Sequence, residues 1–560
     1  MTIIVVISHT LTLYMRLGAY IKQFFVKMLS VSMIKSIRRG RNMENPLVLT
    51  IDFGTQSVRV GLVNKQGEIV ALERVKYEPA YFSPKPGYAE QDPEFYFKHL
   101  CTCTNAIVKN NKDKMDSVIG ISMAFFRDSV VAVDKEGKPL RPAILWLDER
   151  RAEDKNKLPA LNRAIFKLIG MGPTIDLNRK RSMSVWMQEN EPELWEKTDK
   201  FMFISTYINK KLVGEFVDAL SSQAGHLPID FKKGEWYKSD KHIKGSMFGV
   251  PRRMLCKIVK SGQVLGTITE EASKATGLPV GMTVFAGGSD KSAETLGLGV
   301  VDDRIAAISY GTASTVEVPI EKYSDAEPFL PAYPDIVNGF DLDVQIYRGY
   351  WMLNWFIKQF GCEGPTVEDI VVDGKSIQKF NDEMAKIEPG CNGLVLQPYW
   401  GPGLRRPLAK GAIVGFSDVH TKMHMYRAIV EGIAFALREG LELFEKKRLH
   451  HKVTSIRISG GGSQSDLICQ ITADVFNKPV SRIQTFECST MGCAMSAFIA
   501  HGDFKNKKEA AKSMTRISKT FEPNPENVRK YDYLFNNVYM KVYPQLKNIY
   551  KNIKEFDEKN

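Results

Sequence analysis

The 560-residue chain lacks the motifs that mark most metal, redox and dinucleotide sites. Its eight cysteines form no CxxC pair, and no run of cysteine and histidine has the spacing of a zinc site. The motifs GxxxxGKS/T, HExxH and GxSxG are absent, and no GxGxxG follows a strand. These absences argue against a P-loop, a zinc protease, an α/β-hydrolase and a Rossmann site. So few cysteines in so long a chain favour free thiols in a reducing cytoplasm.

An apolar run long enough to cross a membrane is missing at the N-terminus. Arg16 interrupts the first apolar stretch before the roughly 20 residues that a span requires. Seven of the 13 net positive charges lie in residues 1–42, which contain no acid. We therefore treat residues 1–42 as a basic extension outside the fold, and we expect no nucleic-acid partner and no stable membrane insertion. A transit peptide or an interfacial anchor is the alternative for this segment, and we favour a start at Met43.

The composition is that of a globular protein with more than one core. Hydrophobic residues make up 44% of the chain and charged residues 25%, which is ordinary for packed domains. A single hydrophobic core stops growing at about 250–300 residues. We therefore expect at least two domains.

Two distant segments share one pattern: an apolar strand, a Gly-Thr-x-Ser turn and a second strand. The first is LTIDFGTQSVRVGLV at 49–63, and the second is RIAAISYGTASTVEV at 304–318. Glycine leaves backbone N–H groups open to an anion, and the hydroxyls add donors. We interpret the pair as a duplicated hairpin, one copy per domain, whose turns face each other across a cleft and hold polyphosphate. A plain hairpin is the alternative for either turn alone.

Two aspartates accompany these turns. Asp52 ends the first strand, and because a carboxylate repels phosphate we expect it to bind Mg²⁺ through water. Asp290 lies in VFAGGSDKSAETLGLG at 284–299, which predicts a strand, a glycine turn and a helix that opens at Ser292. Phosphoryl transfer needs a group that takes the proton of the attacking hydroxyl, and Asp290 is our candidate. A simple N-cap is the alternative role for Asp290.

A third glycine turn lies near the C-terminus. The segment VTSIRISGGGSQSDLICQITADVF at 453–476 predicts a strand, the turn and a helix capped by Ser465 or Asp466. The segment 422–446 before it predicts a long helix with apolar residues every four positions. We expect this stripe to be core, and its members are Met425, Ile429, Ile433 and Leu437.

Together these motifs resemble the FGGY family of carbohydrate kinases, within the actin/Hsp70/sugar-kinase superfamily. The resemblance covers about residues 46–545, and it also rests on GYAEQDPEFYF, GEFVDALSSQAGHLPIDFKKGEW and GAIVGFSDVHTKMHMYRAIVEGIAF. It implies an α/β fold of two ribonuclease-H-like (actin-like ATPase) domains with a cleft between them. We place the first domain at 43–299, the second at 300–515 and a helical C-terminal tail at 516–560.

The resemblance also implies a reaction. ATP with Mg²⁺ would be the phosphate donor, a small sugar or polyol the acceptor, and Asp290 the general base. A pentulose such as xylulose is favoured over a glycerol-like polyol, and a homodimer is allowed. The residues implied for ATP are Thr55, Gln56, Ser57, Arg59, Gly311, Thr312, Gly461, Gly462 and Ser465. A non-catalytic nucleotide switch or sugar-sensing regulator of the same superfamily is the alternative, and it would not need Asp290.

The sugar loop departs from the family. It reads MAFFRDS, about two residues longer than the Gln-Met-His loop of xylulokinases or the Gln-Arg-Glu loop of glycerol kinases. Arg127 and Asp128 can be aligned with the Arg-Glu pair, and one donor with one acceptor would suit a polyol. An ion pair between them at the surface is the alternative. Lys291 replaces the amide that usually follows the catalytic aspartate, and we count it among the substrate-binding residues.

Overall fold

A computed structural model describes most of the chain. The described residues are 45–155, 157–325, 330–360, 382–400, 406 and 408–559. The chain separates into two compact units, Met1–Pro46 and Leu47–Asn560, and the elements below belong to the second. The basic extension predicted at 1–42 lies outside the described residues.

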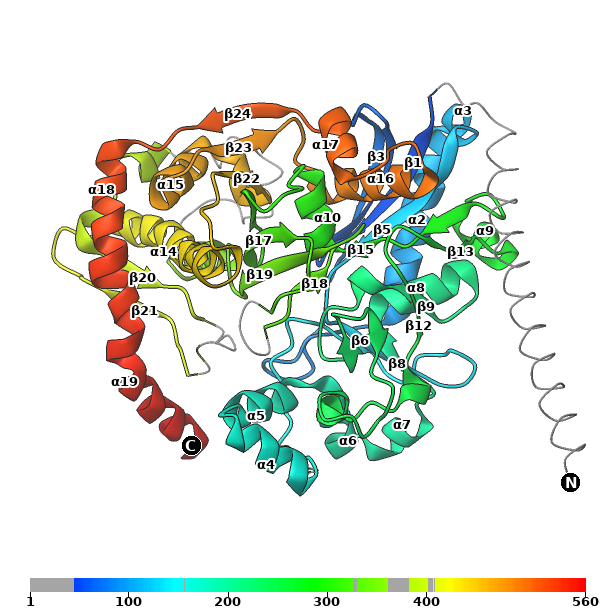
Figure 1. Cartoon of the computed structure of the whole chain (residues 1–560), viewed down its shortest axis with the longest axis horizontal. Helices are drawn as coiled ribbons and strands as arrows, with labels where there is room; N and C mark the ends of the chain where they lie inside the picture. Colours follow the sequence, from blue (N-terminus) through cyan, green and yellow to red (C-terminus); the bar gives the residue numbers. More distant parts are fainter. Residues whose placement is uncertain are drawn as a thin grey trace, which may run out of the picture. The chain divides into compact units, whose positions relative to one another are not determined.

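A first mixed sheet is built around the predicted N-terminal hairpin (Figure 1). Its strands, in spatial order, are β13 (Val264–Thr267), β14 (Thr283–Phe285), β5 (Val118–Phe125), β1 (Leu47–Phe53), β2 (Ser57–Asn64) and β3 (Ile69–Lys76), and β15 (Gly288–Ser289) pairs with β5. β1 runs antiparallel to β2 and parallel to β5. Every residue of β1 is buried, because side chains on one face pack with α2 (Pro93–Asn110) and those on the other with α16 (Cys488–His501).

The second sheet repeats this arrangement. Its strands are β18 (Tyr333–Pro334), β19 (Phe340–Ile346), β17 (Ser314–Ile320), β16 (Ile305–Tyr310), β22 (Ser455–Ser459), β23 (Val480–Ile483) and β24 (Ile517–Phe521). β16 runs antiparallel to β17 and parallel to β22, as β1 does with β2 and β5. The repetition confirms the prediction of two ribonuclease-H-like domains.

Helices α14 (Lys422–Phe444) and α15 (Asp466–Phe476) pack on the second sheet (Figure 1). The predicted stripe of α14 is core: Ile429, Ile433 and Leu437 are at most 1% exposed, and Met425 packs against them. Ser465 caps α15 by accepting a hydrogen bond from the backbone N–H of Ile468. Both expectations for this region are confirmed.

A smaller sheet supports the sugar loop. Its strands are β4 (Glu90–Gln91), β7 (Ala143–Ile144), β6 (Val130–Val133) and β8 (Lys200–Phe203). It shares a separate core with residues of α4 (Ala160–Leu168), α5 (Gly172–Arg181) and α6 (Met183–Asn190). Because the loop with Arg127 and Asp128 joins β5 to β6, it is held at both ends by strands of different sheets.

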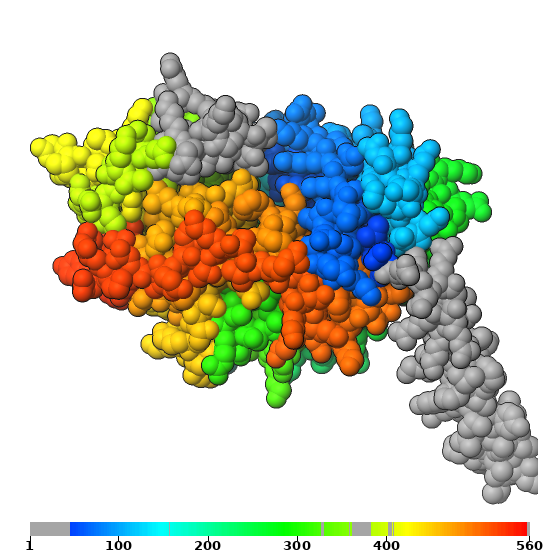
Figure 2. Space-filling model, turned by 90° about the horizontal axis from the view of Figure 1, so that it is seen from above, coloured from blue at the N-terminus to red at the C-terminus, as the bar shows by residue number. Residues whose placement is uncertain are grey.

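Two helices cross between the main sheets. α10 (Asp290–Gly297) follows β15 of the first sheet, and Thr295 donates to Glu317 of β17 in the second (2.8 Å). α16 packs on β1 and β5 although it follows the second sheet in sequence, and Figure 2 shows the orange residues of this part of the chain against the blue ones of the first sheet. The boundary near residue 300 stays a prediction, and residues between 491 and 514, which follow it in sequence, pack on the first sheet.

The structure corrects two predicted elements. α10 begins at Asp290 rather than at Ser292, because the side chain of Ser289 caps it two residues earlier. The predicted helical tail at 516–560 begins instead with β24, which extends the second sheet by pairing with β23. The helices α18 (Pro525–Leu534) and α19 (Met540–Lys559) follow that strand.

The described part of the chain contains seven cysteines, and all seven are free thiols, as predicted for them. Cys362 lies outside the described residues. Among the described helices, none combines the length and the apolar character that crossing a membrane requires.

Candidate active site

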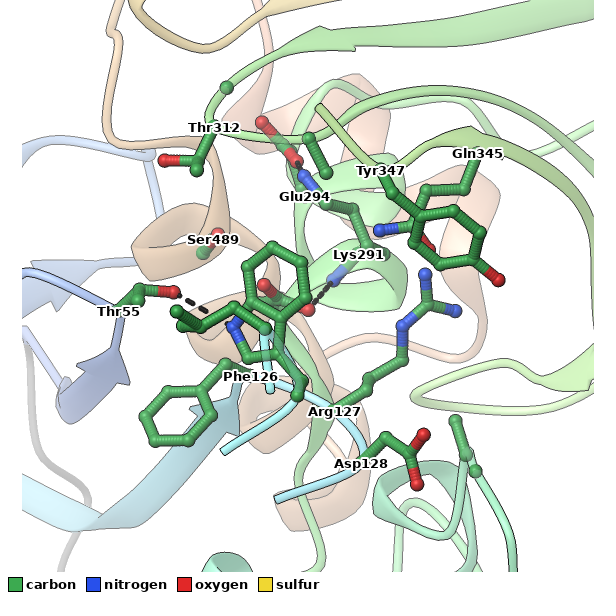
Figure 3. Close-up of a pocket in the computed structure, with 18 of the residues that line it drawn as sticks. Thr55, Phe126, Arg127, Asp128, Lys291, Glu294, Thr312, Gln345, Tyr347 and Ser489 are labelled. Carbon is green, nitrogen blue, oxygen red and sulfur yellow. Dashed lines mark hydrogen bonds and ion pairs between the residues drawn. The ribbon is translucent and has the colours of Figure 1, made fainter. Parts of the chain in front are cut away.

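A cleft of about 1450 Å³ brings the predicted motifs together. Both Gly-Thr-x-Ser turns line it, as do the start of α10 and the glycine turn after β22. Figure 3 shows Thr55 and Thr312 reaching this space from different elements, with Ser489 between them. The duplicated turns and Asp290 therefore share one cavity, as the sequence predicts.

The first turn offers hydroxyl hydrogens to the cleft. Thr55 Oγ1 accepts a hydrogen bond from the indole N–H of Trp146 (3.2 Å), and Ser57 Oγ accepts one from Arg74 (3.2 Å). A hydroxyl that accepts from an N–H keeps its own hydrogen to donate elsewhere. Gln56 holds the turn through its backbone carbonyl, which accepts a hydrogen bond from the backbone N–H of Tyr77 (2.9 Å). This pattern suits a turn that binds an anion.

The second turn is held by hydrogen bonds from the N-terminus of helix α11 (Trp351–Gln359). The carbonyls of Gly311 and Thr312 accept from the backbone N–H groups of Tyr350 and Trp351 (3.0 and 3.4 Å), at the start of α11. The Thr312 side chain is exposed. Carbonyls turned inward leave the threonine hydroxyl at the cleft surface.

Asp52 and Arg59 form a partly buried ion pair at the foot of the first turn. They face each other in register across β1 and β2, and Arg59 Nη1 lies 3.0 Å from Asp52 Oδ2. Arg59 Nε also lies 3.4 Å from Glu487. Burial raises the pKa of Asp52 to about 6 although Arg59 opposes the shift. Arg59, predicted as a phosphate contact, is thus already shared between two carboxylates.

Asp290 stands at the first position of α10 and lines the cleft. Because Ser289 caps the helix, the alternative in which Asp290 serves only as the N-cap is wrong. Burial raises the pKa of Asp290, and Lys291 and Arg127 partly offset that effect. A carboxylate whose pKa is raised toward neutrality is better suited to accept a proton.

The glycines before Asp290 let β15 approach β5. A Cβ at Gly287 would lie 1.9 Å from the carbonyl oxygen of Met123, and one at Gly288 would lie 2.5 Å from the hydroxyl of Ser221. No side chain fits at such distances. The glycines thus serve the packing that places Asp290.

The two residues of the sugar loop have different partners. Arg127 bonds to Asp343 of β19 (2.7 Å) and lies over the ring of Tyr333, whereas Asp128 bonds to His226 (2.7 Å). Figure 3 shows the Arg127 guanidinium directed toward Gln345 and Tyr347, away from Asp128. The alternative of a surface ion pair between them is wrong. Both residues line the cleft.

The third glycine turn has an aromatic floor. The rings of Tyr310 and Tyr350 lie 4.6 Å apart, and a Cβ at Gly462 would lie 2.6 Å from Tyr350. Gly461 and Ser465 line the same end of the cleft. Glycine is therefore required where the turn crosses these rings.

Sequence reasoning missed several residues that complete the site. Trp146, His226, Asp343 and Glu487 contact Thr55, Asp128, Arg127 and Arg59, respectively. Each comes from a segment far from its partner. The motif around each partner carries no signal for such contacts.

Two repeated domains around a cleft with paired glycine-threonine turns define a nucleotide-dependent phosphotransferase. Comparison with known families narrows the class. Residues 47–297 match the N-terminal domain of the FGGY family of carbohydrate kinases, and residues 306–501 match its C-terminal domain. The chain belongs to this family, and it is a carbohydrate kinase.

Individual relatives agree with the family. The chain is 29% identical over 519 residues to xylulose kinase from Lactococcus lactis subsp. lactis (strain IL1403), covering 91% of this chain and 99% of that protein. Crystal structures of a gluconate kinase and of a ligand-bound xylulose kinase from Lactobacillus acidophilus each superpose with a TM-score of 0.75 at 22% identity. Each covers 91% of this chain and 100% of its own. These structures show the same fold.

Proposed function

We propose that this kinase transfers the γ-phosphate of ATP to a hydroxyl of a small sugar or polyol, with a pentulose such as xylulose as the favoured acceptor. The observation that carries the proposal is that Asp290 shares one cleft with Thr55 and Thr312. The xylulose kinase relative supports the choice of a pentulose.

Asp290 is the general base in this proposal. Its carboxylate takes the proton of the acceptor hydroxyl while the hydroxyl oxygen bonds to the γ-phosphorus and the bond to the β-phosphate oxygen breaks, which releases ADP. Thr55, Ser57 and Thr312 donate hydrogen bonds to the phosphate oxygens. Gly461 and Gly462 border the nucleoside over the tyrosine floor. Arg127 and Asp128 border the acceptor sugar.

Asp52 is the residue that would hold Mg²⁺. Its carboxyl is 5% exposed and lines the cleft, and its raised pKa shows that the burial is not fully balanced by Arg59. Among the described residues, no cluster of three or more His, Cys, Asp or Glu could hold a metal ion. Water and the nucleotide phosphates would supply the other ligands, and the ion would neutralise the phosphate charge.

A panel of acceptors with the wild-type chain and Asp290→Asn tests the proposal. Pentuloses, hexuloses, polyols and gluconate are each offered with ATP and Mg²⁺, and ADP release is measured. We expect one acceptor class to react, and we expect Asp290→Asn to lower kcat by about 10³-fold or more while ATP still raises the melting temperature.

Asp113→Asn is the matched control, because Asp113 is 77% exposed on the surface. It should keep wild-type turnover. Near-normal turnover of Asp290→Asn would remove Asp290 from the mechanism, and turnover with a polyol alone would replace the pentulose.

A further inference from the structure

Lys291 follows Asp290 directly but is bonded away from the sugar loop. Its ammonium donates to Glu294 Oε2 (2.8 Å) and to Ser309 Oγ (2.8 Å). Its backbone N–H donates to Asp290 Oδ1 (2.8 Å). Figure 3 shows the side chain extending toward Glu294. The sequence predicts that Lys291 binds the sugar, and in the structure its ammonium is bonded to α10 and β16.

Those partners connect α10 with the nucleotide side of the cleft. Ser309 also donates to Glu294 Oε1 (3.0 Å), and Ser459, opposite Ser309 in register, stabilises the same carboxylate. Ser309 lies two positions before the second phosphate turn, and Ser459 comes directly before the third glycine turn. This partly buried ion pair thus bonds the helix of Asp290 to the end of β16, which is paired with β22.

We propose that Lys291 is a positioning residue: paired with Glu294, it fixes Asp290 relative to the two nucleotide-side turns and sets the charge around it. This inference rests on Asp290 being the base of the proposed function. The pair occupies the helix face that looks toward β16, so it acts on the base and not on the acceptor.

The charges around Asp290 give the proposal a measurable sign. Lys291 and Arg127, from the sugar loop, lower the pKa of Asp290, whereas Glu294 raises it. The charge of Asp52 on β1 also repels that of Asp290. Loss of the Lys291 charge should therefore raise the pKa of the base, and loss of the Glu294 charge should lower it.

Three variants of the full chain test the proposal through the pH dependence of kcat. Lys291→Gln should lower kcat by about 10- to 100-fold at pH 7 and change the KM for the sugar by less than about 3-fold. It should also move the acid limb of the kcat profile, where kcat falls as the base is protonated, to higher pH. Lys291→Arg keeps the charge and should keep the limb near its wild-type position. Glu294→Gln should move the limb to lower pH.

The control is Lys386→Gln, because Lys386 and Glu383 form a pair with the same spacing at the surface (2.6 Å, side chains 66% and 47% exposed). It should leave kcat, KM and the limb unchanged. A Lys291→Gln variant that raises only the KM would make Lys291 a sugar contact and overturn the proposal. So would a shift of the limb in the same direction for Lys291→Gln and Glu294→Gln.

A double-mutant cycle of thermal unfolding needs no turnover. Lys291→Gln, Glu294→Gln and the double variant should be non-additive, because each single change leaves the other charge buried. Additive shifts in melting temperature would overturn the pair. If the wild-type chain phosphorylated no sugar, the proposed function would fail. The cycle would still show whether Lys291 and Glu294 interact.

Discussion

Single buried carboxylates make the stability of this protein depend on pH. Asp341 of β19 is 2% exposed, and burial, together with Asp335, raises its pKa to about 8 although Lys507 opposes the shift. In the unfolded chain, the pKa of this carboxyl is about 3.9. Its stabilising contribution is therefore complete below about pH 4 and is lost as the pH rises through about 8.

Asp341→Asn removes the loss of stability at high pH, because asparagine does not ionise. Relative to the wild type, we expect the variant to gain about 3 kcal/mol in free energy of unfolding between pH 5.5 and pH 8, measured with urea. Asp418→Asn is the control, because Asp418 is exposed, and its curve should follow that of the wild type. Parallel curves for wild type and Asp341→Asn would show that Asp341 is ionised in the folded state.

Site residues inside glycine-rich motifs could be predicted from the sequence. Thr55, Thr312 and Asp290 all line the predicted cleft, because each is placed by a turn or cap that its immediate neighbours determine. The partner of Arg127 could not be predicted. Asp343 is 216 positions away, and nothing near either residue specifies that β19 passes the sugar loop.

At the scale of elements, the crossing of α10 and α16 depends on two glycines. A Cβ at Gly492 would lie 1.8 Å from the carbonyl oxygen of Ala293, and one at Gly297 would lie 1.8 Å from that of Cys488. Backbone atoms cannot rotate away as a side chain does. Gly492→Ala should therefore lower stability by about 1–3 kcal/mol, although alanine alone favours a helix by about 1 kcal/mol. Thermal unfolding measures the change.

Gly172→Ala separates packing from helix propensity. The nearest atom to a Cβ at Gly172 lies 4.0 Å away, so this variant should be neutral or slightly more stable. A stabilised Gly492→Ala variant would mean that the two helices can separate without cost.

Strands and hairpins were more predictable than the ends of helices. Alternating apolar residues identify β1, β2, β16 and β17, since one face of each hairpin repeats every second residue. The start of α10 was misplaced by two residues because Ser289 and Ser292 are both good caps, and the hydrogen bond from the Ser292 N–H to Ser289 decides between them. The sequence does not indicate β24, because four of its five residues are exposed.

At the scale of the molecule, the duplication could be predicted, but the packing of α16 on the first sheet could not. One core joins Val48, Ala124 and Phe285 of the first sheet to Met495 and Phe498 of α16. The apolar pattern of α16 shows that it is buried and does not show against which sheet. Because this core includes distant parts of the chain, we expect the two domains to unfold in one transition.

The ion pair between Arg127 and Asp343 contributes to this cooperativity. Its side chains are 13% and 5% exposed, and the guanidinium also balances Glu317, which faces Asp343 in register. Loss of one partner from a buried pair leaves an uncompensated charge, at a cost of about 3–5 kcal/mol. Arg127→Gln should therefore lower the stability of the whole chain by about that amount while calorimetry still records one transition.

Arg348→Gln is the matched control for this prediction. Arg348 also joins the two parts of the chain, through Glu149 at 2.7 Å, but Glu149 is 55% exposed, and such a pair contributes at most about 1 kcal/mol. The double variant Arg127→Gln with Asp343→Asn should recover part of the loss, because the amide needs no counter-charge. Equal losses for Arg127→Gln and Arg348→Gln would refute a buried link between the domains, and two transitions in the wild type would show that the shared core does not couple them.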